Sequence, residues 1–197
     1  MVKTHWKNTR NCYGWAFAFL HWLMVVWLLA LIGLGLWMVS LDYYHPWYVR
    51  APDWHRSLGV LLGVPLLVRL LWRWMNPPPV LTGTATSRFL ARWVHRLFYV
   101  LMFFLILSGY LITTARGASV EVFDWFEIPA WFFGSAFLPA ENLEDQAGWW
   151  HRWLAYGLVG LIVLHAAAAL WHHFVLGDGS LWRIFGRCPT QLSDRRK

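Results

Sequence analysis

The sequence predicts an all-α membrane protein built as a bundle of four transmembrane helices. Of its 197 residues, 58% are hydrophobic and only 14% are charged, whereas a soluble domain carries about 25% charged residues. Four apolar stretches are each long enough to cross a bilayer, which takes about 20 residues of helix. The 17 tryptophans suit the two membrane interfaces, where a large apolar ring with one polar N–H is favoured.

The predicted spans differ in length and in what ends them. The first exceeds the bilayer minimum, so we expect it to tilt or to project; it is too long for the apolar core of a signal peptide, and no small-residue cleavage site follows it. The second ends at Pro77, Pro78 and Pro79, which cannot continue a helix. In a single domain of residues 1–197, we expect spans at 13–41, 55–75, 89–114 and 148–176, an outer loop at 115–147 and a tail at 177–197.

The distribution of charge predicts the orientation of the chain. Thirteen of the seventeen Lys and Arg residues lie in the N-terminal segment, the 69–96 region and the tail, whereas eight of the ten acids lie in the other two loops and their flanks. The positive-inside rule therefore predicts that both termini are cytoplasmic. Because the basic residues flank apolar spans and line no groove, they argue against nucleic-acid binding.

Histidines inside the spans point to function, because a polar ring in hydrocarbon needs a partner. The last span holds His151 and His165, and a fourteen-residue step puts them about 21 Å apart along a helix and within about 40° of the same face. With the predicted topology, His55 lies at the depth of His151 near the outer side, and His21 lies at the depth of His165 near the inner side. We therefore predict two bis-histidine metal sites, His55 with His151 and His21 with His165.

A pair of histidines in an apolar pocket favours haem b as the bound group. Zinc usually takes four ligands, and no acid or cysteine lies at these depths to complete such a site. Cys12 and Cys188 lie outside the spans and belong to no short-spaced motif, so we expect neither a disulfide nor a thiolate metal site. Haem b needs only two axial ligands, and two irons about 20 Å apart leave the macrocycle edges close enough for electron transfer across the bilayer.

The same fourteen-residue step finds further cofactor-binding candidates. It leads from His21 to Gly35, and on the third span from His95 to Gly109; a glycine lets a flat ring approach the backbone. The matching position on the second span is Arg69, which could pair with a propionate of the inner haem or extend toward the interface. The role of His95 stays open among an axial ligand, a partner of a propionate or quinone, and a packing residue.

Several runs of the chain carry a family resemblance. They are LHWL at 20–23, WHRSLG at 54–59, VRLLWR at 68–73, VHRLFY at 94–99, and LHAAAALWHHF at 164–174 followed by DGSLWR. Over most of its length the sequence thereby resembles the bacterial cytochrome b561 family. The resemblance implies a four-helix, di-haem b protein of the bacterial inner membrane that exchanges electrons with ubiquinone, and it implies that the fourth span supplies one ligand to each haem.

Two functions agree with these features. In the first, an outer one-electron donor such as superoxide reduces the outer haem, and electrons pass to ubiquinone; Arg56 and Arg152 adjoin the outer histidines and are the candidate catalytic residues, which would steer a small anion. The alternative is a haem b membrane-anchor subunit that exchanges electrons with a periplasmic redox protein docked on the 115–147 loop, unless that loop lies on the bilayer and caps the outer haem. The expected partners are membrane lipid, ubiquinone, and either superoxide or a periplasmic redox protein.

Overall fold

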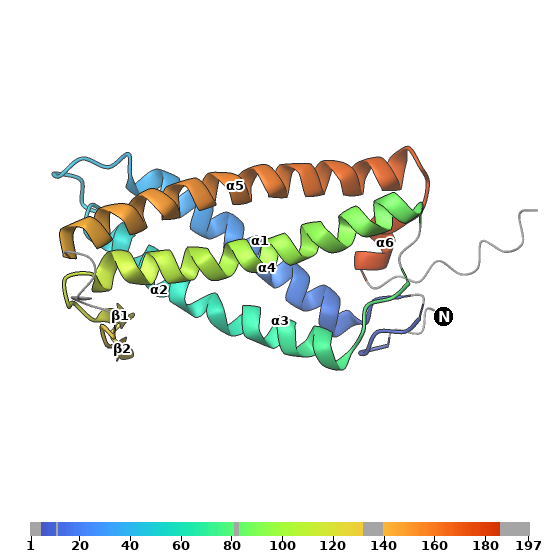
Figure 1. Ribbon diagram of the computed structural model, residues 1–197, viewed down its shortest axis with the longest axis horizontal. Helices are drawn as coiled ribbons and strands as arrows, with labels where there is room; N and C mark the ends of the chain where they lie inside the picture. The colour runs from blue at the N-terminus through green and yellow to red at the C-terminus, as the bar shows by residue number, and fades with distance from the viewer. Residues whose placement is uncertain (1–4, 11, 81–82, 132–139, 186–197) are drawn as a thin grey trace, which may run out of the picture.

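Four long helical segments form the framework of the protein (Figure 1). The computed structural model describes residues 5–10, 12–80, 83–131 and 140–185. Within these residues four segments are long and apolar enough to cross a membrane, which confirms the predicted four-helix membrane fold. They are α1 (Trp15–Met38), α2 (Arg50–Leu61) continued by α3 (Gly63–Met75), α4 (Ala85–Thr114) and α5 (Ala140–Phe174), and a short α6 (Ser180–Ile184) follows.

Three helical segments begin before the apolar stretches that predict them. The second span starts at Arg50 in α2, α4 starts at Ala85, and α5 starts at Ala140. Their first turns are polar, so hydropathy does not detect them, although the backbone is already helical. At the start of α4, Thr84 is the N-cap and its side chain accepts a hydrogen bond from the Ser87 N–H at 3.2 Å, which satisfies one of the unpaired donors of a helix N-terminus.

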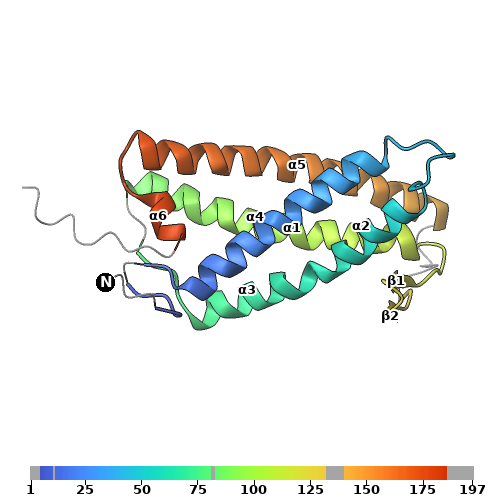
Figure 2. The same cartoon turned by 180° about the vertical axis from the view of Figure 1, so that it is seen from behind.

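The helices pack as a bundle with a small apolar centre. α4 and α5 run side by side along the molecule, and α1 crosses obliquely between them and α3 (Figures 1 and 2). Met24 of α1, Leu66 of α3 and Met102 of α4 meet in the middle of the bundle, where all three are buried. Most other apolar side chains face outward, as contact with lipid requires. The buried polar side chains of the described residues lie in two groups, one toward each end of the bundle.

One end of the bundle carries a β-hairpin, and we call it the hairpin end. Strands β1 (Val120–Val122) and β2 (Phe126–Ile128) pair in antiparallel register, with Phe123 and Asp124 at positive φ in the turn, the conformation of a type I′ hairpin. The buried Ser57 of α2 anchors it, since its hydroxyl accepts from the Phe123 N–H at 3.2 Å and lies 3.4 Å from the Glu121 carbonyl. The sequence did not predict this hairpin in an otherwise all-α protein, because three-residue strands are too short to show an alternation of apolar and polar residues.

The opposite end holds the N-terminal segment and α6, and we call it the terminal end (Figure 1). The Asn8 side chain donates to the Asn76 carbonyl at 3.1 Å and accepts from the Gly14 N–H at 2.9 Å, so the N-terminal segment is tied to the end of α3. Cys12 is disulfide-bonded, which corrects the expectation of no disulfide; the other cysteine, Cys188, lies outside the described residues.

Candidate functional site

Histidine rings from two helices meet at two levels along α5. Near the hairpin end, the ring centroids of His151 on α5 and His55 on α2 lie 6.1 Å apart with an interplanar angle of 79°. Toward the terminal end, the ring centroids of His165 on α5 and His95 on α4 lie 5.3 Å apart, also at 79°. The structure thus brings His55 and His151 together, whereas the rings in contact with His165 are those of His95 and Phe98.

Two glycines border the hairpin-end pair. A Cβ atom added at Gly35 of α1 would lie 3.1 Å from Cε1 of His55, and one added at Gly109 of α4 would lie 3.3 Å from Cε1 of His151. Both distances are shorter than ordinary van der Waals contacts, so a Cβ atom at either position would displace its histidine ring by a few tenths of an ångström. The two glycines named from the fourteen-residue step therefore lie together at the hairpin-end level, one on each flanking helix.

The hydrogen bonds of His151 define its tautomer. Its Nδ1 lies 3.1 Å from the Leu105 carbonyl oxygen and 3.1 Å from the Ser108 hydroxyl oxygen. A carbonyl only accepts, so Nδ1 carries the proton, and in a neutral ring Nε2 is left with a lone pair that can bind a metal. Nδ1 of His55 has no partner in hydrogen-bonding geometry, although the Leu31 carbonyl is near enough to interact with it.

The terminal-end histidines show two different tautomers. Nδ1 of His95 lies 2.6 Å from the Ala91 carbonyl, so it carries the proton, as in His151. Nδ1 of His21 lies 3.2 Å from Nη2 of Arg69, and a guanidinium only donates. Nδ1 of His21 is therefore the acceptor, and the proton of the neutral ring is on Nε2. The His21 ring lies within electrostatic range of both His95 and His165.

Arg69 is buried among these groups, with 6% of its surface exposed. Its Nε donates to the Tyr99 hydroxyl at 3.2 Å, and its guanidinium lies 4.7 Å from the centroid of the Phe17 ring. Its Nη1 has no hydrogen-bond partner. A buried guanidinium with an unpaired N–H group can still bind an anionic oxygen. The structure thus directs Arg69 into the bundle and away from the interface.

The two arginines predicted to steer an anion lie on the surface of the hairpin end. Arg56 forms an ion pair with Asp53, and both side chains are partly exposed. Arg56 also lines a shallow cleft with Trp54 and Asp124. Arg152 is exposed on α5, next to His151 in the sequence. Both guanidinium groups are accessible to solvent, but Asp53 partly neutralises the charge of Arg56.

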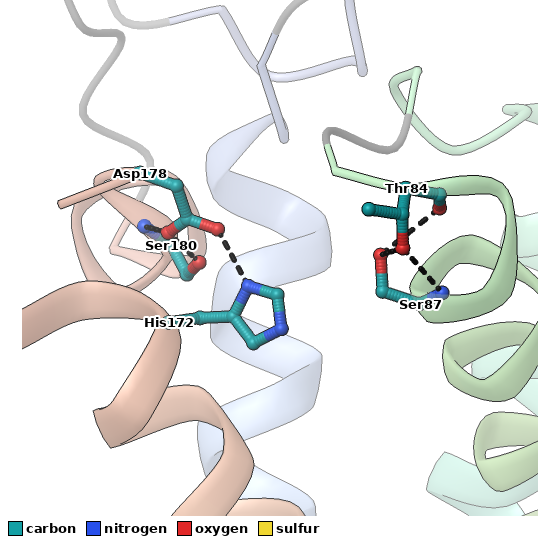
Figure 3. Close-up of polar contacts among 5 residues, drawn as sticks. All are labelled: Thr84, Ser87, His172, Asp178 and Ser180. Carbon is teal, nitrogen blue, oxygen red and sulfur yellow. Dashed lines mark hydrogen bonds and ion pairs between the residues drawn. The ribbon is translucent and has the colours of Figure 1, made fainter. Parts of the chain in front are cut away.

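A polar cluster at the end of α5 contains a residue that the sequence reasoning missed, Asp178 (Figure 3). Its carboxylate accepts from Nδ1 of His172 at 2.9 Å and from the N–H and hydroxyl of Ser180. Partial burial alone would raise the pKa of this carboxyl, but the hydrogen bonds from Ser180 and His172 outweigh burial and hold the pKa below its ordinary value. The sequence signal for this cluster was the run Asp-Gly-Ser after the last span, because Asp and Gly are common in turns.

The donor set limits what the histidine sites can bind. Among the described residues, no group of three His, Cys, Asp or Glu side chains could hold a metal ion. Each level therefore offers imidazole nitrogens without the further protein ligands that a bare zinc ion takes. Two axial imidazoles in an apolar setting suit an iron whose other ligands come from its own macrocycle.

Comparison with known proteins gives consistent matches. A family model described as prokaryotic cytochrome b561 matches residues 12–187. The chain is 42% identical to cytochrome b561 homolog 2 of Escherichia coli K12 over 185 residues, which cover 93% of this chain and 96% of that protein. It is 33% identical to the probable superoxide oxidase CybB of Yersinia pestis over 147 residues, which cover 72% of this chain and 76% of that protein.

Replacing Asp178 should loosen the turn between α5 and α6. Because the pKa of Asp178 is depressed in the folded state, its stabilising effect is present above the ordinary carboxyl pKa of 3.8 and is lost as the pH falls below that value. Asp178→Asn should lower the free energy of local opening by about 1 kcal/mol at pH 6. Hydrogen exchange of the backbone amides of residues 176–184, compared with wild type at the same pH, measures this change. The exposed Asp145→Asn is the control, and a difference from wild type that persists well below pH 3.8 would contradict the assignment.

Proposed function

Because the chain belongs to the prokaryotic cytochrome b561 family, we propose that it passes electrons from a one-electron donor, superoxide, through two haem b groups to ubiquinone. As a member of this family it is a haem b oxidoreductase of a bacterial membrane, which its helices cross several times. On this proposal the membrane is the inner membrane. The hairpin end then faces outward and the terminal end faces the cytoplasm, as the distribution of Lys and Arg favours.

The observation that carries the proposal is the pair His55 and His151 with its two bordering glycines. The two ring centroids lie 6.1 Å apart, a separation at which both imidazoles could bind one metal placed between them. Gly35 and Gly109 lie directly against these two rings, where a Cβ atom would press on them. Bound haem b would supply a one-electron redox centre at this level.

The second haem is proposed at the terminal-end level, with His21 and His165 as its ligands. Coordination through Nε2 of His21 requires the proton to move to Nδ1, and Nδ1 then no longer accepts from Arg69. The freed guanidinium can pair with a haem propionate, which is the stronger acceptor. His95, in contact with His165, is proposed to border this haem, and α5 then contributes one ligand to each level.

Superoxide is proposed as the donor on two grounds. One relative bears the name probable superoxide oxidase, and Arg56 and Arg152 lie on the hairpin-end surface beside the proposed ligands of the outer haem. The loops at this end are acidic overall, so a local cationic site is needed to attract an anion. Ubiquinone is proposed as the acceptor because the family resemblance implies exchange with the quinone pool.

A second candidate function rests on the exposed aromatic residues of the hairpin. Trp125 and Trp131 are 73% and 71% exposed, next to the acidic residues Glu121, Asp124 and Glu127. Exposed apolar groups rimmed by charge are typical of docking sites. On this reading the chain is a haem b anchor subunit, and a periplasmic redox protein delivers the electrons.

Anaerobic stopped-flow spectroscopy of the purified chain tests the main proposal. We expect b-type bands from two haems, rapid haem reduction by superoxide, and reoxidation by ubiquinone. His165→Ala should keep the outer haem and its reduction by superoxide but lose the inner haem and the reoxidation. A colourless protein, or loss of both haems in a folded variant, would contradict the proposal. A protein whose haems are not reduced by superoxide, and which purifies with a stoichiometric soluble subunit, would favour the anchor function.

Two glycines of α1 provide a matched test of the outer haem site. Gly35→Ala should lower the haem content from two groups toward one, because the added methyl group meets the His55 ring. Gly33→Ala is the control, since a Cβ at Gly33 meets no atom within 4 Å. Pyridine haemochrome assays of both variants measure the outcome, and equal haem contents would count against a cofactor between these helices.

Charge variants test the steering of superoxide. The double variant Arg56→Gln with Arg152→Gln should slow haem reduction by superoxide about tenfold at low salt and flatten its dependence on ionic strength. Asp53→Asn should have the opposite effect, because it frees Arg56 from its ion pair. Arg88→Gln, at the terminal end, is the control. Unchanged rates in the double variant at every ionic strength would rule out steering by these residues.

A further inference from the structure

Ser108 is a buried polar residue in the apolar part of α4. Only 6% of its surface is exposed, and it directly precedes Gly109 in the chain. A serine in a membrane helix commonly donates to a carbonyl one turn earlier, and Ser108 does so, with its Oγ 2.7 Å from the Phe104 carbonyl. The same oxygen lies 3.1 Å from the Leu105 carbonyl. What sets it apart is its contact with another helix, since it also lies 3.1 Å from Nδ1 of His151.

The directions of these hydrogen bonds follow from the chemistry of the partners. The Phe104 carbonyl only accepts, so the Ser108 hydroxyl hydrogen is donated along that shorter contact. The Leu105 carbonyl, 3.1 Å from Nδ1 of His151, also only accepts, so Nδ1 carries a proton. The Ser108 oxygen therefore accepts from the same N–H group through a lone pair. His151 donates one N–H to two acceptors from adjacent turns of α4.

We propose that Ser108 is a positioning residue that lowers the reduction potential of the outer haem through His151. This inference rests on the proposed function, in which His151 is a ligand of that haem. Acceptors at Nδ1 fix the tautomer and the orientation of the ring and make Nε2 a stronger electron donor. A stronger donor stabilises the oxidised iron more than the reduced iron, which lowers the potential.

The opposite ligand has weaker support. Nδ1 of His55 has no partner in hydrogen-bonding geometry, and only the backbone of Leu31 lies near its ring, whereas Nδ1 of His151 has two acceptors. The two proposed ligands are therefore electronically unequal. The Leu105 acceptor is a backbone group that substitution cannot remove. Ser108 is consequently the side chain through which the sequence can adjust the potential at this level.

Redox titration of variants at Ser108 tests the inference. Ser108→Ala should retain both haems and raise the potential of the outer haem alone, with about a fivefold change in its ratio of reduced to oxidised form at a fixed applied potential, as expected for the loss of one hydrogen bond. Ser108→Thr keeps the hydroxyl and should restore the wild-type potential. Electron paramagnetic resonance of the oxidised outer haem should report the altered ligand in Ser108→Ala and not in Ser108→Thr.

Thr114→Val is the matched control. Thr114 is buried on the same helix and donates to the Tyr110 carbonyl at 2.9 Å, one turn back as Ser108 does, and it has no contact with a histidine among the described contacts. If Ser108→Ala fails to incorporate haem, the isosteric Ser108→Cys replaces it, because a thiol is a weak acceptor and should shift the potential in the same direction.

The outcomes separate this inference from the proposed function. An unchanged outer potential in Ser108→Ala or Ser108→Cys would overturn it, as would an equal shift in Thr114→Val or a shift confined to the inner haem. If the wild-type protein binds two haems and His151→Ala loses the outer one, such results refute only the role of Ser108. If His151→Ala retains both haems, the proposed function fails at this site.

Discussion

A buried imidazole nitrogen without a partner is costly, because the membrane interior offers no water. This constraint governs both histidine levels of the bundle. At His151 the partners of Nδ1 are acceptors, so the proton is fixed there and Nε2 has a free lone pair. At His21 the partner of Nδ1 is the Arg69 guanidinium, a donor, so the proton is on Nε2. Opposite partners therefore give the two rings opposite tautomers.

The two levels consequently differ in how ready they are for a metal. At the hairpin end, a ligand nitrogen, a suitable ring separation and two bordering glycines are present together. At the terminal end, His21 can bind iron through Nε2 only after its proton moves and Arg69 takes another acceptor. An anionic group that enters the bundle with the iron meets this requirement, and the two carboxylates of haem b are such groups. On the proposed function, Arg69 would link the binding of the metal to the binding of the propionate.

The sequence predicted the features that depend on helix geometry. Periodicity and depth predicted that His55 and His151 meet, and the fourteen-residue step found Gly35 and Gly109, because a straight helix preserves both angle and rise. It did not predict the contact of His95 with His165. That contact depends on how far α4 is rotated toward α5, which packing of many side chains decides.

Small polar residues and loops were the other limit of prediction. The contact of Ser108 with His151 depends on a single rotamer, and an isolated serine in an apolar span is usually a packing residue. The β-hairpin rests on two positive φ angles at Phe123 and Asp124, which neither residue favours in isolation. Its burial against Ser57 stabilises that turn, and this tertiary contact has no signature in the local sequence.

α5 fixes the distance between the two levels, so differences between them must arise on the other helices. It contains no proline and is helical without interruption from Ala140 to Phe174. The rise of about 21 Å between His151 and His165 is then a rigid spacing. The groups that distinguish the levels, Ser108 of α4 and Arg69 of α3, come from neighbouring helices. On the proposed function, each redox centre can therefore be tuned separately while the path between them stays constant.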